Sequence, residues 1–220
     1  SQNVFVNAGG GLTTANGNLL VEANQQGTPT SGNFAGVRLN GLNAMFRVTG
    51  SGLLTVKGKG GNTGNDTEGI YLMSGGKILG GTNTVTLEGI GGPTSGFRSY
   101  GVLSGTPSEM SSTGGNIVIN GTGDGTGVNS FGIGLGYNGV YAGGTISAGG
   151  QGNITITGRG SLNYTEEGSV GIDMRALVTT AGGNITFNGY GGGSGNARFC
   201  TGISIFATVS PGGMGTLTPY

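Results

Sequence analysis

One short phrase recurs along the whole chain: two apolar residues flank a third residue, and two glycines spaced two positions apart usually follow. The full copies are Leu19-Leu20-Val21, Leu54-Thr55-Val56, Val85-Thr86-Leu87, Ile117-Val118-Ile119, Ile154-Thr155-Ile156 and Ile185-Thr186-Phe187. A truncated copy follows at Leu217-Thr218-Pro219, and successive copies begin 31 to 37 residues apart. Self-similarity at this period is typical of stacked units, because a single unit cannot bury its own apolar face. We therefore expect a repeat protein with one continuous core.

Glycine stands four positions after the first residue of most copies. These glycines are Gly58, Gly89, Gly121, Gly158 and Gly189, and Ala23 takes the place in the first copy. Glycine at a fixed position after an apolar alternation predicts either a positive φ or a close approach of two backbone segments.

Two further apolar segments lie between successive copies. The second segment reads Gly36-Val37-Arg38-Leu39, Gly69-Ile70-Tyr71-Leu72, Gly101-Val102-Leu103, Gly132-Ile133-Gly134-Leu135, Gly171-Ile172-Asp173-Met174 and Gly202-Ile203-Ser204-Ile205. The third is less regular and includes Phe46 to Val48, Ile78-Leu79, Met110, Ile146, Leu177-Val178 and Val209. Three short strands per repeat predict an all-β parallel β-solenoid of about six to seven coils of 31–37 residues. We expect one domain over residues 1–220, with a partial coil at 1–18, repeats beginning near 19, 54, 85, 117, 154 and 185, and a partial coil at 216–220.

Other folds fit the pattern less well. A β-propeller is the closest alternative, with blades of about 40 residues and four strands each. Antiparallel sandwiches require turn signals every ~8–12 residues and no like residues at identical phase. The 55 glycines disfavour helices, and they do not recur at every third position as collagen requires. Disorder is disfavoured because apolar residues recur at the same phase and mean hydropathy is +0.01.

Charge is sparse and balanced. Nine basic and nine acidic residues give a net charge of zero, so no basic stripe is present to bind nucleic acid or an anionic membrane surface. No apolar run approaches the ~20 residues that cross a bilayer, and membrane insertion is not expected. The start at Ser1, without Met, suggests a processed or excised segment.

In-register stacking places equivalent residues of successive coils about 4.8 Å apart. One outward column then reads Glu22, Lys57, Glu88, Asn120, Thr157 and Asn188, in which no like charges meet. Another column contains Asn116, Asn153 and Asn184, which predicts an amide ladder.

Several of these asparagines begin glycosylation sequons. At Asn153 and Asn184 the repeat itself explains the pattern, so a ladder is favoured over a glycan there. The better acceptor candidates are Asn65 and Asn163, which lie in long loops.

Residues that carry chemistry are few. Asp66, Glu68, Glu166 and Glu167 are interpreted as solvated loop charges, and three coils separate the two pairs by roughly 14 Å, too far for a glycosidase pair. The segment 62–68 has weak calcium-loop spacing, and one threonine column is a weak ice-binding signal because its neighbour is mixed.

Histidine is absent and Cys200 is the single cysteine, so we expect no metal site. Cys200 itself is interpreted as a small buried residue. We expect no cofactor and no enzymatic activity.

The run 183–192, followed by Gly202-Ile203-Ser204-Ile205, resembles the repeats of filamentous-haemagglutinin-like and autotransporter-type β-solenoid surface proteins of bacteria. The resemblance extends from about residue 17 to the C-terminus. It implies a right-handed parallel β-helix in an extracellular or cell-surface stalk, adhesin or fibre, with host or matrix glycans as further partners.

The two ends of the chain complement each other. Val4, Phe5 and Val6 occupy the second-segment position of one coil, whereas the stretch from Leu217 to Tyr220 occupies the first-segment position of another. Neither end carries a polar cap, and an exposed end coil recruits other strands. We therefore expect a homopolymer that assembles head to tail, with an open, non-closing contact. Arbitrary cuts in a longer solenoid would leave the same ends.

The leading functional hypothesis is thus a structural subunit of an extracellular filament or adhesive fibre. The alternative is a carbohydrate-active or glycan-binding β-helix, similar to polysaccharide lyases or hydrolases. It requires a groove where Asp66, Glu68, Asp173 or Glu166 converge.

Overall fold

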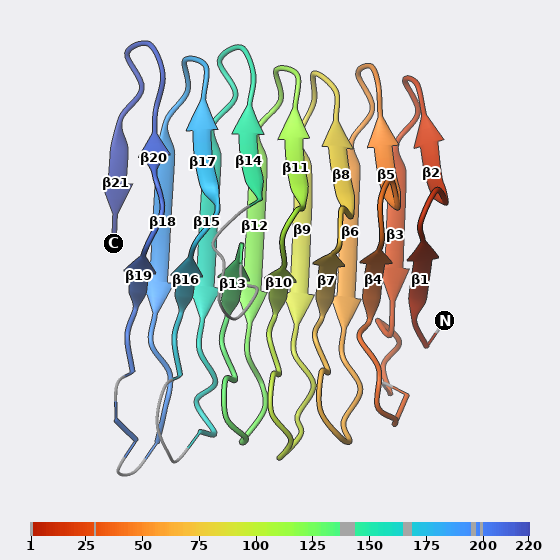
Figure 1. Cartoon of the computed structure of the whole chain (residues 1–220), viewed down its shortest axis with the longest axis vertical. Helices are drawn as coiled ribbons and strands as arrows, with labels where there is room; N and C mark the ends of the chain where they lie inside the picture. The colour runs from red at the N-terminus through yellow and green to blue at the C-terminus, as the bar shows by residue number, and fades with distance from the viewer. Residues whose placement is uncertain (1, 29, 137–143, 165–168, 195–196, 199) are drawn as a thin grey trace.

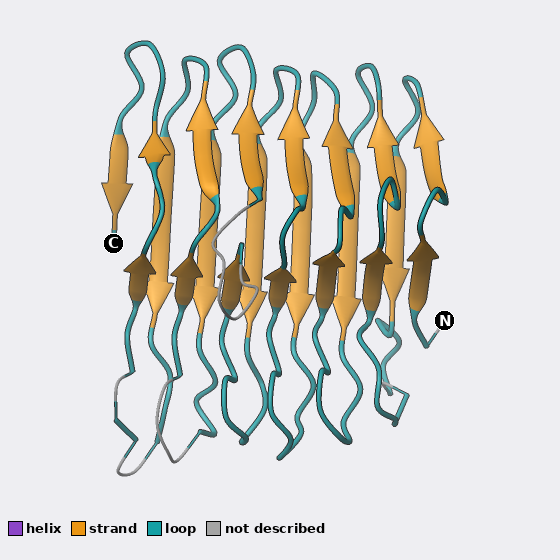
Figure 2. Cartoon of the chain, in the orientation of Figure 1, coloured by secondary structure: helices purple, strands orange, loops and turns teal. Residues whose placement is uncertain are grey.

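The computed structural model describes residues 2–28, 30–136, 144–164, 169–194, 197–198 and 200–220. These residues form three parallel sheets of seven strands each and no helix. Sheets A and B lie on one side of the molecule, and sheet C lies behind them (Figures 1 and 2). The predicted all-β parallel solenoid is confirmed.

Each coil of the chain contributes one strand to each sheet. Sheet A contains β1 (Val4–Asn7), β4 (Val37–Asn40), β7 (Ile70–Met73), β10 (Val102–Ser104), β13 (Ile133–Leu135), β16 (Ile172–Met174) and β19 (Ile203–Ile205). Sheet B contains β2 (Gly11–Thr14), β5 (Met45–Val48), β8 (Lys77–Gly80), β11 (Glu109–Ser112), β14 (Thr145–Ala148), β17 (Leu177–Thr180) and β20 (Val209–Ser210). Sheet C contains β3 (Leu19–Ala23), β6 (Leu54–Lys59), β9 (Val85–Ile90), β12 (Ile117–Thr122), β15 (Ile154–Arg159), β18 (Ile185–Tyr190) and β21 (Leu217–Pro219). The chain makes about six turns, and we number its coils one (β1–β3) to seven (β19–β21).

The register of sheet C is the one that the repeat predicts. Ile117 pairs with Val85 on one side and Ile154 on the other, and Ile154 pairs in turn with Ile185. The strands alternate between buried and partly exposed residues, as β-strands with one face in the core do. The buried residues of all three sheets form one continuous hydrophobic core.

The glycines that follow each sheet C alternation serve a close backbone approach. They lie inside the strands and pair with one another, as Gly58 does with Gly89, and none of the five has a positive φ. A Cβ on Gly58 would overlap the carbonyl oxygen of Gly69, which precedes β7. Of the two expectations for these positions, close approach is therefore the correct one.

The asparagine ladder is also present, at the entrance to sheet C. Asn116 Oδ1 accepts the backbone N–H of Asn153 at 2.9 Å, and Asn153 Oδ1 accepts that of Asn184 at 2.8 Å. Asn184 Oδ1 extends the ladder to the backbone N–H of Thr216 at 2.9 Å. Each side chain thus ties one coil to the next before the strands begin.

Long loops connect each sheet C strand to the next sheet A strand (Figure 1). The other connections are short, except the one between β13 and β14, most of which lies outside the described residues. Cys200 lies in the long loop between β18 and β19 and is exposed, so its interpretation as a buried residue is wrong. Ser99, Ser130 and Ser169 precede their sheet A strands at the same position and are fully buried. Cys200 differs because it belongs to the last coil, which has no further coil against it in this structure.

Candidate functional sites

The two end coils expose residues that are buried everywhere else in the stack. In sheet A, Leu39 and Leu72 have no solvent exposure, but Ile205 at the end of the same column is 41 % exposed. In sheet C, Leu54 is completely buried, but Leu217 is 43 % exposed. At each end of the stack, three parallel strands also have a free edge: β1, β2 and β3 at one end, and β19, β20 and β21 at the other. Each end of the solenoid is therefore an apolar surface bordered by unpaired backbone groups.

The assembly residues expected from the sequence lie on these end surfaces. Val4 and Val6 of β1 pack partly against the core, and Phe5 between them points outward and is exposed. Leu217 and Tyr220 are exposed at the other end of the stack. The structure thus places both groups in terminal coils at opposite ends (Figure 1).

Charged and aromatic side chains contact one another on the outer side of sheet A. The guanidinium carbon of Arg38 lies 5.4 Å from the ring centre of Phe5 and 5.5 Å from that of Tyr71. Farther along the stack, Tyr100 and Phe131 pack edge to face at 5.1 Å and form a small cluster with Leu103, apart from the main core. This side of the solenoid therefore has an apolar layer of its own.

Glu68 lies in this layer, and its interpretation as a solvated loop charge is wrong. Its side chain is completely buried, and neither carboxyl oxygen has a hydrogen-bond partner on another described residue. Burial raises the pKa of Glu68 to about 8, and the Asp66 carboxylate adds to the rise. The backbone N–H of Glu68 and the cations Arg98 and Arg38 act in the opposite direction. Glu68 is therefore a protonated, neutral acid at pH 7.

Asp66 behaves differently, although only one residue separates it from Glu68. Its Oδ1 lies 2.8 Å from Nε of Arg98, and its side chain is half exposed. An exposed ion pair of this kind contributes at most about 1 kcal/mol. Asp66 thus remains a surface charge, as expected.

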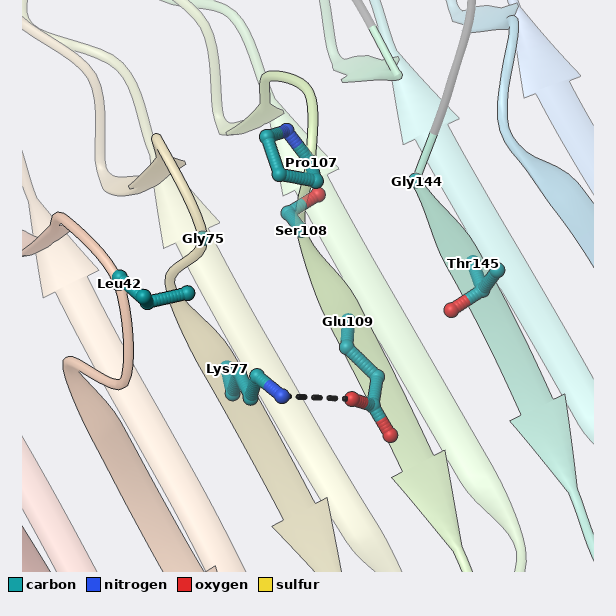
Figure 3. Close-up of a pocket in the computed structure, with 8 residues that line it drawn as sticks. All are labelled: Leu42, Gly75, Lys77, Pro107, Ser108, Glu109, Gly144 and Thr145. Atoms are coloured by element: carbon teal, nitrogen blue, oxygen red, sulfur yellow. Dashed lines mark ion pairs between the residues drawn. The ribbon is translucent and has the colours of Figure 1, made fainter.

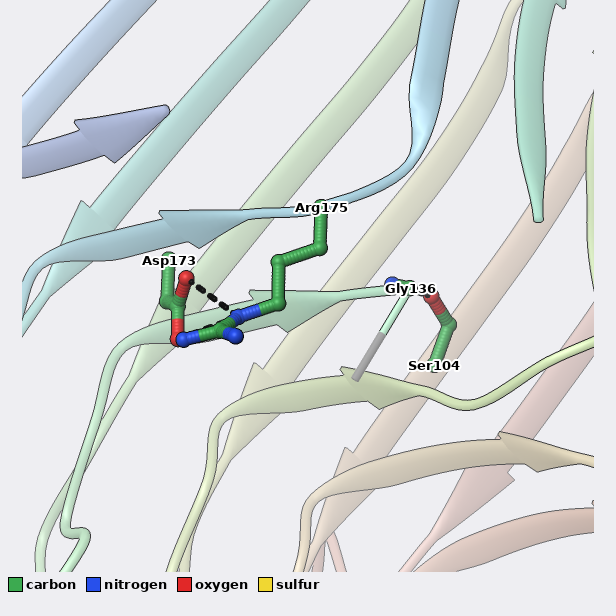
Figure 4. A network of polar contacts seen from close by, with 4 residues as sticks. All are labelled: Ser104, Gly136, Asp173 and Arg175. Carbon is green, nitrogen blue, oxygen red and sulfur yellow. Dashed lines mark hydrogen bonds and ion pairs between the residues drawn. The ribbon is translucent and has the colours of Figure 1, made fainter. Parts of the chain in front are cut away.

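Asp173 is also buried, and it is held by a neighbour. Nε of Arg175 lies 3.1 Å from one carboxylate oxygen of Asp173 and 3.2 Å from the other (Figure 4). The Arg175 guanidinium in turn lies 4.7 Å from the ring centre of Phe206. The Asp173 carboxylate is therefore engaged in a fixed ion pair. A separate hydrogen bond joins the two preceding coils, where the backbone N–H of Gly136 donates to Oγ of Ser104 at 3.0 Å.

Among the described residues, the carboxylates of Glu68 and Asp173 do not converge. Glu68 precedes β7 and Asp173 lies in β16, and β10 and β13 separate these strands. Three strand spacings amount to roughly 14 Å. Glu166 and Glu167 lie outside the described residues. Within the described part of the chain, no three His, Cys, Asp or Glu side chains are grouped as metal ligands.

A hollow of about 310 Å³ lies at the corner between sheets A and B (Figure 3). Leu42 and Pro107 form its apolar walls, and Lys77 and Glu109 lie on adjacent strands at its floor. Nζ of Lys77 is 3.4 Å from Oε2 of Glu109. Because each charge already has a partner, this hollow offers no unpaired charge to a ligand.

The glycosylation candidates differ in how their side chains are used. Oδ1 of Asn65 accepts the backbone N–H of Phe97 at 3.0 Å, and Asn65 is only partly exposed. Asn163 is exposed, beside the buried Tyr164. Asn153 and Asn184 belong to the ladder. Of the four, Asn163 is therefore the one that is exposed and lies outside the ladder.

Sequence reasoning missed two features of these surfaces. The burial of Glu68 has a signal, because Ala35, Tyr100 and Phe131 stand at the same place before their own sheet A strands and are all buried. The hollow at the corner between sheets A and B has no such signal, since it combines residues from several coils.

Comparisons with known protein families, with curated proteins and with solved structures give no match to this chain. The described residues include no helix of the length and apolarity that a membrane span requires. The chain is thus placed by its architecture alone, as a parallel β-solenoid repeat protein.

Proposed function

We propose that the protein is a structural subunit of an extracellular filament or adhesive surface fibre. Coil seven of one copy stacks on coil one of the next, so that each of the three sheets continues from copy to copy. The resemblance of the repeats to bacterial filamentous-haemagglutinin-like surface proteins supports this location and role. The principal support is the pair of uncovered apolar end coils.

The two ends match in residue type when the columns are extended. Continuation of the register would place Ile203 beside Val4, Ile205 beside Val6, Val209 beside Leu12 and Leu217 beside Leu19. Every one of these contacts is apolar. Complete burial of each such side chain contributes roughly 2 kcal/mol, and the backbone edges gain hydrogen bonds as well. A contact of this type does not close on itself, so it produces a filament.

Two leucines of coil one provide a matched test. Leu12 is 47 % exposed in an inward column of β2, whereas Leu20 is 58 % exposed on the outer face of β3. We expect wild-type protein to form filaments in electron micrographs as concentration rises. Leu12→Asp should prevent its own polymerisation, because a carboxylate would be buried in the contact, and Leu20→Asp should polymerise normally.

The same variant gives a readout that depends on its being folded. Leu12→Asp keeps an intact coil seven, so a small proportion of it should cap wild-type filaments and shorten them. Compact wild-type monomers at high concentration, or an equal loss of assembly in Leu20→Asp, would contradict axial stacking.

A further inference from the structure

Two hollows lie along the edge of the solenoid where the strands of sheet C end. The larger has a volume of about 260 Å³ and is lined by residues that include Thr122, Arg159, Leu162 and Asn163. The smaller has a volume of about 220 Å³ and is lined by Thr30, Lys59, Gly60, Asn62 and Pro93.

The register relates the cations of the two hollows to each other. Lys59 pairs with Ile90, Ile90 with Thr122, and Thr122 with Arg159. Each cation is the last residue of its strand and follows an inward-facing glycine, so it points outward. Lys59 and Arg159 therefore occupy one column, three coils and roughly 14 Å apart.

The two hollows repeat the same chemistry. Each combines one cation with an asparagine, a threonine and an exposed apolar residue, which is Pro93 in the smaller hollow and Leu162 in the larger. Asp124 lines the larger hollow and lies within electrostatic reach of Lys59 in the smaller one. The hollows thus belong to one continuous line of polar groups.

Both cations are available to a ligand. Neither Lys59 nor Arg159 forms an ion pair with a described residue, in contrast to Lys57 and Lys77. The guanidinium carbon of Arg159 lies over the ring of Tyr190, 4.1 Å from its centre, and the Arg159 side chain stays exposed. A planar guanidinium in this position presents its N–H donors in a fixed fork suited to a carboxylate.

We propose that the two hollows are subsites for one acidic polysaccharide, a chain containing uronic acids, that lies parallel to the solenoid axis. Sugar carboxylates bind Lys59 and Arg159. Asn62 and Asn163 bind hydroxyl groups, and the apolar faces of the sugar rings pack on Pro93 and Leu162. Asp124, between the cations, accepts hydrogen bonds from sugar hydroxyls. This site is independent of the end coils, so it stands whether or not the protein polymerises.

The test is a calorimetric titration of the unglycosylated chain with a galacturonate hexamer, and with a xylose hexamer as the neutral counterpart. We expect the acidic hexamer to bind and the neutral one to bind at least about tenfold more weakly. Lys59→Gln and Arg159→Gln should each weaken binding about tenfold, because loss of one hydrogen-bonded charge is of that order. The double variant should not bind detectably.

Lys57→Gln is the matched control. It removes the same charge from the same face of the same strand, but Lys57 pairs with Glu88 and lines neither hollow. Its affinity should stay within about twofold of wild type. Absence of binding, equal binding of the neutral hexamer, or an equal loss in Lys57→Gln would each overturn the proposal.

Discussion

The buried acid Glu68 makes stability depend on pH in a way that one substitution removes. Its pKa is about 8 in the folded protein, against an ordinary value of 4.5. Between these values the folded protein holds a proton that the unfolded chain has released. Unfolding therefore releases a proton, and the free energy of unfolding falls as pH rises through this window. Below pH ~4.5 Glu68 contributes no such loss, and above pH ~8 the loss is complete.

The magnitude follows from the width of the window. Each pH unit between the two pKa values lowers the free energy of unfolding by about 1.4 kcal/mol. The interval from 4.5 to about 8 thus corresponds to a loss on the order of 5 kcal/mol. Glu68→Gln keeps the shape of the side chain but cannot ionise, so it abolishes this slope.

The assay is urea unfolding of wild type and Glu68→Gln at pH 5, 6, 7 and 8, followed by circular dichroism. The buried amide carries a constant cost at every pH, so the decisive quantity is the change in the difference between the two proteins. We expect that difference to move in favour of Glu68→Gln by about 1.4 kcal/mol per pH unit. The half-exposed Glu88 supplies the control Glu88→Gln, which removes a surface carboxylate in place of a buried one. Parallel curves for wild type and Glu68→Gln would mean that Glu68 ionises normally, and would refute its burial as a neutral acid.

Three further predictions concern packing, the ladder and the end coil. Gly58→Ala should lower the free energy of unfolding by at least ~2 kcal/mol, because the added Cβ would overlap the carbonyl oxygen of Gly69. Gly114→Ala is the control, because a Cβ there meets nothing within 4 Å. Its free energy of unfolding should lie within ~0.5 kcal/mol of wild type in the same urea titration. Asn153→Ala should cost about 0.5–1.5 kcal/mol, because Oδ1 of Asn153 accepts a solvent-exposed backbone N–H from the next coil. An unchanged urea midpoint would contradict this role. Cys200 should react quickly with a thiol reagent in dilute, monomeric protein, because it is exposed. In the assembled filament the next copy covers coil seven, so the reaction should be slower. Equal rates for monomer and filament would argue against axial stacking.

The stacking of the coils was predictable because a parallel in-register solenoid places like residues side by side. Each apolar column, such as Ile117, Ile154 and Ile185, is visible in the sequence as a recurrence at fixed phase, and the structure pairs those residues directly. The same logic yielded the asparagine ladder and the Lys57–Glu88 pair, whose charged atoms are 3.2 Å apart. Period and phase were sufficient for these features.

Exposure was harder to predict, because it depends on what covers a side chain and not only on where it points. Glu68 was assigned to solvent on the basis of its charge, yet the outer side of sheet A has a buried layer of its own. Cys200 was assigned to the interior on the basis of its residue type, yet it belongs to the last coil. In both cases the exposure of the side chain is decided by neighbouring coils, which are distant in sequence.

The sequence by itself determined the architecture of this protein: three strands per repeat, their register, and the apolar columns of the core. Local alternation and a constant period contain all of that information. Only the tertiary structure showed that Lys59 and Arg159 each border a hollow. It also showed that the sheet C glycines pack against backbone instead of adopting a turn conformation, and that Glu68 is shielded from water. Those properties arise from contacts among several coils and loops, and no single repeat encodes them.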